Sequence, residues 1–145
     1  MRVFLDTSVL VAAALEGHPA HTQSLAALDR IQRGADEGIV SAHSVAEVYA
    51  TLTRLPAPFR HSPEQALLLI EENILGHFQL VSLSGTDYAS LIREAALASI
   101  QGGTIYDAIL LKAASKAKVE RVYTLNLKHF QAVAQGGLAA IISAP

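Results

Sequence analysis

The sequence contains no cysteine and no tryptophan, and only 17% of its 145 residues are charged, against about 25% in typical soluble domains. The lack of cysteine excludes disulfides, thiolate chemistry and cysteine-ligated zinc, and it fits a reducing compartment. The longest apolar run, residues 9–15, is far shorter than the ~20 residues of a membrane-spanning helix. Asp6 interrupts what would otherwise resemble a signal peptide. We therefore expect a cytoplasmic protein without membrane segments.

Apolar residues are abundant and make up 51% of the chain, which excludes intrinsic disorder. The length suits one domain with a sizeable core, so we expect residues 1–145 to form a single domain. Charge is unevenly distributed: residues 1–107 hold six basic and twelve acidic residues, whereas residues 108–145 hold five basic residues and one acidic residue. The basic C-terminal stretch is either a local phosphate-binding face or an ordinary solvated helix face.

Short apolar runs alternate with helical patterns along the chain. We expect strands at residues 2–5, 39–40, 80–83, 121–125 and 138–143. We expect helices at residues 7–15, 20–33, 44–54, 63–75, 86–99, 105–117 and 128–134. Apolar strands separated by helices are typical of a parallel sheet covered on both faces, so the predicted class is α/β. Ligands bind at the carboxyl ends of the strands in such sheets.

Three carboxylates lie at helix starts, where this rule places chemistry. Asp6 follows the first strand, Glu47 lies near the start of its helix, and Asp107 shares a helical stripe with apolar residues. Each has a structural alternative: Asp6 as an N-cap, and the other two as the ends of capping boxes at residues 44–47 and 104–107. By its helical pattern alone, Glu47 faces solvent. Because a parallel sheet gathers helix starts at one edge, we expect the three to converge on a divalent cation, Mg2+ or Mn2+.

A fourth polar motif, Thr124-Leu125-Asn126, ends the fourth predicted strand. The side-chain carbonyl of Asn126 can ligate a metal or hold a metal-bound water, and the Thr124 hydroxyl can donate or accept a hydrogen bond. The alternative is that Asn126 is simply a turn residue.

In order and spacing, these motifs resemble those of the PIN-domain ribonucleases, and the length resembles that of VapC toxins of bacterial and archaeal toxin–antitoxin pairs. The resemblance rests on Asp6-Thr7-Ser8, Glu47, Asp107 and Thr124-Leu125-Asn126 with Phe130 following, and it extends from Arg2 to about Ser143. It implies a three-layer PIN-like fold with a central parallel sheet of about five strands flanked by helices. It implies metal ligation by Asp6, Glu47 and Asp107, with supporting polar roles for Thr7, Ser8 and Thr124.

The implied activity is metal-dependent endoribonuclease cleavage of RNA phosphodiester bonds, with Asp6, Glu47, Asp107 and Asn126 as the catalytic residues. Family members often carry a further acid at the position of Asn126 or His129, and this chain has neither. We therefore expect one tightly bound ion, with a second ion left open. Candidates for contact with the RNA backbone are Lys112, Lys116, Lys128 and His129. No aromatic platform is evident beyond Tyr49, Tyr106 and Phe130, which favours recognition of structured RNA by shape over stacking of a single strand.

The resemblance also implies a homodimer that a cognate antitoxin protein silences. The wide apolar arc of residues 67–75 and the helix before it are the candidate antitoxin surface, and the alternative is that they are ordinary core. Two other functions stay open. A haloacid-dehalogenase-type phosphatase also begins with a strand ending in Asp, but it requires a second Asp where this chain has Ser8. The other is a PIN-like module that binds RNA or protein and lacks catalysis because the fourth acid is missing.

Overall fold

The computed structural model describes residues 1–145 and has a five-stranded sheet at its centre. The strands are β1 (Arg2–Leu5), β2 (Glu37–Ser41), β3 (Phe78–Val81), β4 (Arg121–Tyr123) and β5 (Ile142–Ser143). Their order in the sheet is β3-β2-β1-β4-β5, and every neighbouring pair is parallel. The predicted α/β class is therefore confirmed, and β1 lies at the centre of the sheet.

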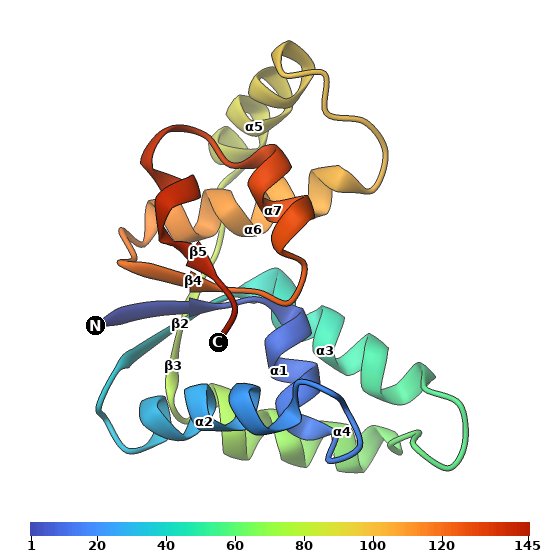
Figure 1. Ribbon diagram of the computed structural model, residues 1–145. Helices are drawn as coiled ribbons and strands as arrows, with labels where there is room; N and C mark the ends of the chain where they lie inside the picture. Colours follow the sequence, from blue (N-terminus) through green and yellow to red (C-terminus); the bar gives the residue numbers. More distant parts are fainter.

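Helices cover both faces of the sheet, giving three layers (Figure 1). One face carries α1 (Thr7–Ala14), α2 (His21–Gln32), α3 (Ala42–Arg54) and α4 (Pro63–Ile70), and α4 continues into the helical turn η1 (Glu71–Leu75). The other face carries α6 (Thr104–Lys116) and α7 (Leu127–Val133), with α5 (Gly85–Leu97) packed outside α6. The short helix η2 (Gly136–Ile141) leads into β5.

The alternation of side chains along β1 supplies both cores. Val3 and Leu5 belong to the core beneath α1 to α4, whereas Phe4 belongs to the core beneath α6 and α7, and all three are almost fully buried. Successive side chains of a strand point to opposite faces, so a central strand with apolar residues throughout requires cover on both sides. This requirement explains why the continuous apolar run was a sound predictor of a parallel sheet.

Two predicted elements are wrong in detail. Residues 138–143, expected to form one strand, are mostly the 3-10 helix η2, because Gly136 takes a left-handed φ of 59° and redirects the chain. Residues 63–75, expected to form one helix, widen after Ile70 into a π-helical turn. There Asn73 donates its side-chain amide to the Leu69 carbonyl at 3.0 Å and accepts a hydrogen bond from Gln32 at 3.0 Å, in competition with the regular helical ladder.

The β3 strand begins two residues earlier than predicted because Phe78 pairs with Gly38 of β2. A Cβ at position 38 would lie 2.5 Å from Ile31 and 2.8 Å from the Phe78 ring. The glycine therefore permits close packing of α2 and β3 across β2.

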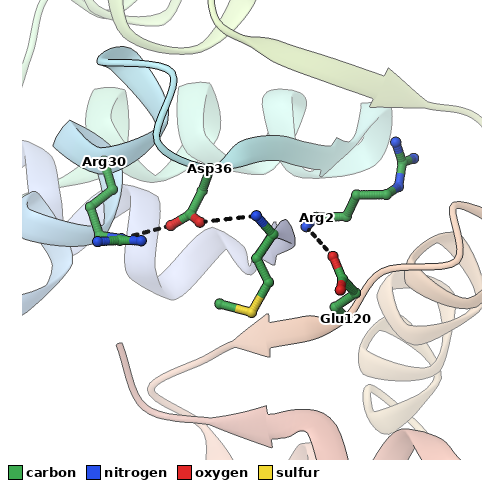
Figure 2. A network of polar contacts seen from close by, with 5 residues as sticks. Arg2, Arg30, Asp36 and Glu120 are labelled. Carbon is green, nitrogen blue, oxygen red and sulfur yellow. Dashed lines mark hydrogen bonds and ion pairs between the residues drawn. The ribbon is translucent and has the colours of Figure 1, made fainter.

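A polar network holds the N-terminal ends of the strands together (Figure 2). The buried Asp36 accepts hydrogen bonds from Arg30 Nε at 2.7 Å and from the Met1 amine at 3.3 Å. The bond from Arg30 lowers the pKa of Asp36. Beside it, the Arg2 amide donates to Glu120 at 2.7 Å. These contacts join β1 to the segments before β2 and β4, at the amino-terminal ends of the strands.

Candidate active site

The carboxyl ends of β1, β2 and β4 surround a polar cleft of about 340 Å³. The structure brings the three predicted acids together there, from the starts of α1, α3 and α6. Its walls are formed by Asp6, Thr7, Ser8, Val11, His18, Glu47, Thr51, Tyr106, Asp107, Leu110, Leu125 and Asn126. The predicted polar residues Thr7, Ser8 and Asn126 thus share one cleft with the acids, although they lie up to 120 positions apart in the sequence.

Asp6 is the most constrained of the acids and is only 3% exposed. Its Oδ2 accepts hydrogen bonds from the Ser8 hydroxyl at 2.6 Å and from the Thr124 hydroxyl at 2.8 Å. Each hydroxyl in turn accepts a backbone amide: Leu125 N–H donates to Ser8, and Asn126 N–H donates to Thr124, both at 3.0 Å. Because the amides occupy acceptor positions on the hydroxyls, both hydroxyl protons are directed to Asp6.

Both side-chain hydrogen bonds to Asp6 are made at Oδ2, and none is made at Oδ1. Asp6 occupies the N-cap position of α1, yet its side chain makes no capping hydrogen bond. Burial raises the pKa of Asp6, and the bonds from Ser8 and Thr124 oppose that rise. The backbone amides of Thr7 and Ser8 also oppose the rise, so Asp6 combines its N-cap position with a place in the cleft wall.

Glu47 is half-buried and lies in the same cleft. Its Oε1 accepts a hydrogen bond from the Thr7 hydroxyl at 3.2 Å and lies 3.4 Å from His43 Nε2. Partial burial raises the pKa of Glu47; the charges of Asp6 and Asp107 add to that rise, and His43 opposes it. The solvent-facing alternative for Glu47 is therefore wrong.

The capping box predicted at residues 44–47 is also absent. The N-cap of α3 is Ser41, whose hydroxyl accepts the His43 amide at 3.2 Å. Ser44 lies inside the helix, where its buried hydroxyl has no hydrogen-bond partner. The helix therefore begins earlier than the sequence pattern indicated, so Glu47 lies in its second turn, too far from the N-cap to complete a capping box.

Asp107 lies on the cleft side of α6, beside the buried Leu110. The N-cap of α6 is Gly103 and no side chain caps it, so the capping box at residues 104–107 is wrong as well. Partial burial raises the pKa of Asp107, the charge of Asp6 raises it further, and His129 opposes the rise. The carboxylate of Asp107 thus has no hydrogen-bonded protein partner and faces two other acids.

The donor set suits a hard divalent cation. Three carboxylates line the cleft without a lysine or arginine among its walls, and oxygen ligands of this kind favour Mg2+ or Mn2+. The mutual charge effects on the pKa values of Glu47 and Asp107 show that the acids interact. As placed, they do not close into a compact three-ligand sphere. The oxygen donors of the cleft suit a cation, and Asp6 is the acid with the most side-chain hydrogen bonds among the three.

Two of the four predicted RNA-contacting residues lie elsewhere. Lys112 pairs with Glu94 at 3.2 Å, and Lys116 pairs with Asp87 at 2.6 Å, both on α5. On a helix these lysines project about 140° and about 180° away from Asp107, so a role at the cleft is not supported. Lys128 and His129 are exposed on the first turn of α7, and His129 is close enough to Asp107 to affect its pKa.

Three residues, His18, His43 and Thr51, escaped the sequence-based prediction, and the position of Tyr106 beside the acids did as well. His18 and Thr51 line the cleft, and the rings of His43 and Tyr106 stack at its mouth with 5.9 Å between centroids and 1° between planes. Helical spacing from Glu47 was an available signal for His43 and Thr51, which lie four residues to either side. No sequence pattern indicates that His43 and Tyr106 meet, because their contact depends on how α3 and α6 pack.

The family model of the PIN domain matches residues 3–136. The chain belongs to the PIN-domain family. Among its relatives, ribonuclease VapC27 of Mycobacterium tuberculosis is 33% identical over 116 residues, which cover 80% of this chain and 79% of VapC27. Ribonuclease VapC40 of the same species is 32% identical over 124 residues, covering 85% of each chain. Within the PIN family the chain therefore falls with the VapC ribonucleases, and the phosphatase alternative is wrong.

Solved structures show the same PIN fold. The sarcin-ricin-loop-cleaving toxin VapC20 of Mycobacterium tuberculosis matches with a TM-score of 0.67 and 14% identity, covering 88% of this chain and 92% of VapC20. A chain of VapBC2 from Rickettsia felis, bound to a promoter DNA fragment, has a TM-score of 0.67 at 18% identity and covers 100% and 99% of the two chains. At these identities the likeness concerns the fold alone. None of the helices has the length and apolar character needed to span a bilayer.

Proposed function

We propose that this PIN-domain chain is the endoribonuclease toxin of a VapBC-type pair and that Asp6, Glu47 and Asp107 hold its divalent metal. The observation that carries the metal site is the orientation of Asp6, whose Oδ2 is held by two hydroxyls in a cleft that Glu47 and Asp107 also line. The family and its ribonuclease relatives support RNA as the substrate.

A bound Mg2+ or Mn2+ supplies Lewis acidity, which polarises a phosphodiester and acidifies a water molecule. The protein contributes position and charge. Asp6 is fixed by Ser8 and Thr124, and Glu47 is held through Oε1 by Thr7. Glu47 would complete the ligand set of the metal or position the attacking water. Asn126, exposed at the rim, orients the phosphate or a water through its side-chain amide.

The test is single-turnover cleavage of a labelled structured-RNA pool in Mg2+, in Mn2+ and in EDTA, with an Asp6→Asn, Asp107→Asn double variant in parallel. We expect cleavage that requires metal and is lost in the double variant. The stabilisation of the folded chain by Mg2+ in a thermal melt is a second readout, and it is expected to disappear in the same variant. Cleavage that survives in the double variant contradicts the assignment. RNA binding without cleavage in either metal would favour the non-catalytic module.

We propose that an antitoxin binds the groove between α1, α2 and α4, whose walls include Leu10, Ala13, Ala14, Leu25, Leu28, Leu69, Asn73 and Ile74. The predicted arc of residues 67–75 divides here: Ile70 and Ile74 are core, whereas Leu67, Leu68 and Leu75 are exposed. Two structural neighbours, VapBC2 of Rickettsia felis and FitAcB of Neisseria gonorrhoeae, support such a partner.

Co-purification with the product of an adjacent short reading frame tests the surface. Leu25→Glu places a charge on the groove, and it is expected to abolish co-purification while leaving metal-dependent cleavage intact. Ile92→Glu, on the exposed face of α5, is the matched control and is expected to retain the partner. The homodimer stays a prediction that light scattering on the purified chain can test.

A further inference from the structure

A second cleft of about 240 Å³ adjoins the acidic one. Glu47, Thr51 and Tyr106 line both clefts, and the second is completed by His43, Ala50 and Arg54. Its walls come from α3 and the start of α6, and only two of its six residues are hydrophobic. A ligand held at the acids can therefore extend directly into a mostly polar neighbouring site.

The shared wall carries a flat aromatic surface. Tyr106 stacks on His43 with parallel rings, yet 53% of Tyr106 remains exposed to solvent. His43 also lies against Glu47, which fixes the pair next to the acids. An exposed ring held by a parallel neighbour is a surface on which a nucleobase can stack.

Arg54 supplies the positive charge that the acidic cleft lacks. It is the only lysine or arginine lining either cleft. It is exposed at the end of α3 and makes no hydrogen bond or ion pair, whereas Arg30 and Arg33 are each paired with an acid. A free guanidinium is suited to bidentate contact with a phosphate.

We propose that the second cleft binds an unpaired nucleotide adjacent to the scissile phosphate, with its base on Tyr106 and its phosphate on Arg54. The inference rests on the proposed ribonuclease function and assigns two residues of this chain to the nucleotide beside the scissile phosphate. Stacking requires an exposed base face, which a paired base within a helix does not offer. The structure thus favours an unpaired segment, whereas the sequence favoured recognition of structured RNA by shape alone.

The experiment measures the affinity of a labelled 12-nucleotide single-stranded RNA of mixed sequence by fluorescence anisotropy in EDTA, so that no cleavage occurs. Tyr106→Ala is expected to weaken binding on the order of 10-fold, as for the loss of one stacked base. Tyr106→Phe is expected to retain binding, since the ring remains. Arg54→Gln is expected to reduce the salt dependence of binding by about 0.7 in the log–log slope, as for one phosphate contact.

Matched controls lie on α5, which lines neither cleft. Tyr88→Ala and Arg93→Gln remove an exposed tyrosine and an unpaired arginine there, and both are expected to bind RNA as the parent chain does. Equal affinities for Tyr106→Ala and Tyr88→Ala would overturn the proposal, as would a Tyr106→Ala defect of the same size for the RNA annealed into a duplex.

Failure of this subsite is distinguishable from failure of the ribonuclease proposal. The Mg2+-dependent thermal stabilisation and its loss in the Asp6→Asn, Asp107→Asn variant test the metal site without reference to Tyr106 or Arg54. If metal-dependent cleavage is present while Tyr106→Ala and Arg54→Gln bind and cleave RNA normally, the subsite is wrong and the nuclease assignment stands. A Tyr106→Ala defect confined to antitoxin binding would also overturn the subsite.

Discussion

Replacing Thr124 by valine tests whether the hydroxyl network prepares Asp6 for a metal. Valine has nearly the shape of threonine, and position 124 is fully buried, so the change removes the hydroxyl with little effect on packing. Two hydrogen bonds are lost: the one donated to Asp6 Oδ2 at 2.8 Å and the one accepted from the Asn126 amide at 3.0 Å. The methyl group that replaces the hydroxyl faces a buried carboxylate.

The expected cost follows from these contacts. A hydrogen bond to a charged group contributes about 1.5–3 kcal/mol, and the Asn126 amide can recover a partner because that residue is exposed. We therefore expect a loss of about 2–3 kcal/mol in the free energy of unfolding. For a chain of this size that corresponds to a fall in Tm of roughly 4–12 °C. Because the Thr124 bond lowers the pKa of Asp6, its loss raises that pKa further, and Mg2+ affinity is expected to fall about 10- to 100-fold.

The assay combines urea denaturation with cleavage rates across a Mg2+ titration. Thr124→Ser is the control because it keeps the hydroxyl and removes only a methyl group. We expect Thr124→Val to need more Mg2+ than Thr124→Ser and to recover much of its rate at saturating metal. Equal Mg2+ requirements in the two variants would refute the reasoning, because the hydroxyl would then have no part in preparing Asp6.

Three further predictions follow from the packing and the pKa shifts. Folding raises the pKa of Asp6, Glu47 and Asp107, so their stabilising contribution is present below about pH 4 and is lost as pH rises through the raised values. In metal-free buffer, Asp107→Asn should therefore gain stability relative to the parent between pH 4 and pH 7; a constant difference in urea melts would contradict this. The contribution of Asp36 to stability depends on pH in the opposite direction, because folding lowers its pKa. Asp36→Asn should lower the free energy of unfolding by about 1 kcal/mol at pH 7, and this difference from the parent should shrink as the parent protonates below about pH 4. Gly38→Ala should lower stability by about 1–3 kcal/mol, because its Cβ meets Ile31 at 2.5 Å; an unchanged Tm would show that the contact relaxes freely.

The layers of the fold were predictable because burial on both faces leaves a periodic signal. Val3, Phe4 and Leu5 serve two different cores, and only a covered parallel strand accommodates three consecutive apolar residues in this way. The apolar run before Ser143 is misleading for the same reason. Leu138 and Ile141 pack against the second core from a 3-10 helix, and burial alone does not distinguish a strand from such a turn.

The acids were predictable from their place in the chain, but their surroundings were not. Asp6 and Asp107 follow rules about strand ends and helix stripes that hold in this fold. The orientation of Glu47 depends on where α3 begins, and the helix starts at Ala42, three residues before the first apolar residue of its pattern. The ion pairs of Lys112 and Lys116 with α5 were not predictable, because charge counted along a stretch of sequence gives no direction around a helix and these partners are distant in the chain.

Gathering three acids in one cleft disfavours their ionised forms, and the hydroxyl network around Asp6 opposes this effect. Burial and mutual repulsion both favour the protonated forms of the three acids, and a protonated carboxyl is a poor metal ligand. Ser8 and Thr124 counter this at Asp6, where burial is deepest, because each donates a proton that only the ionised oxygen accepts well. The two hydroxyls therefore hold the pKa of Asp6 below the value that burial alone would give it. In the proposed metal site, stability and metal affinity place opposite demands on this residue, because burial favours the protonated carboxyl and a metal requires the ionised one.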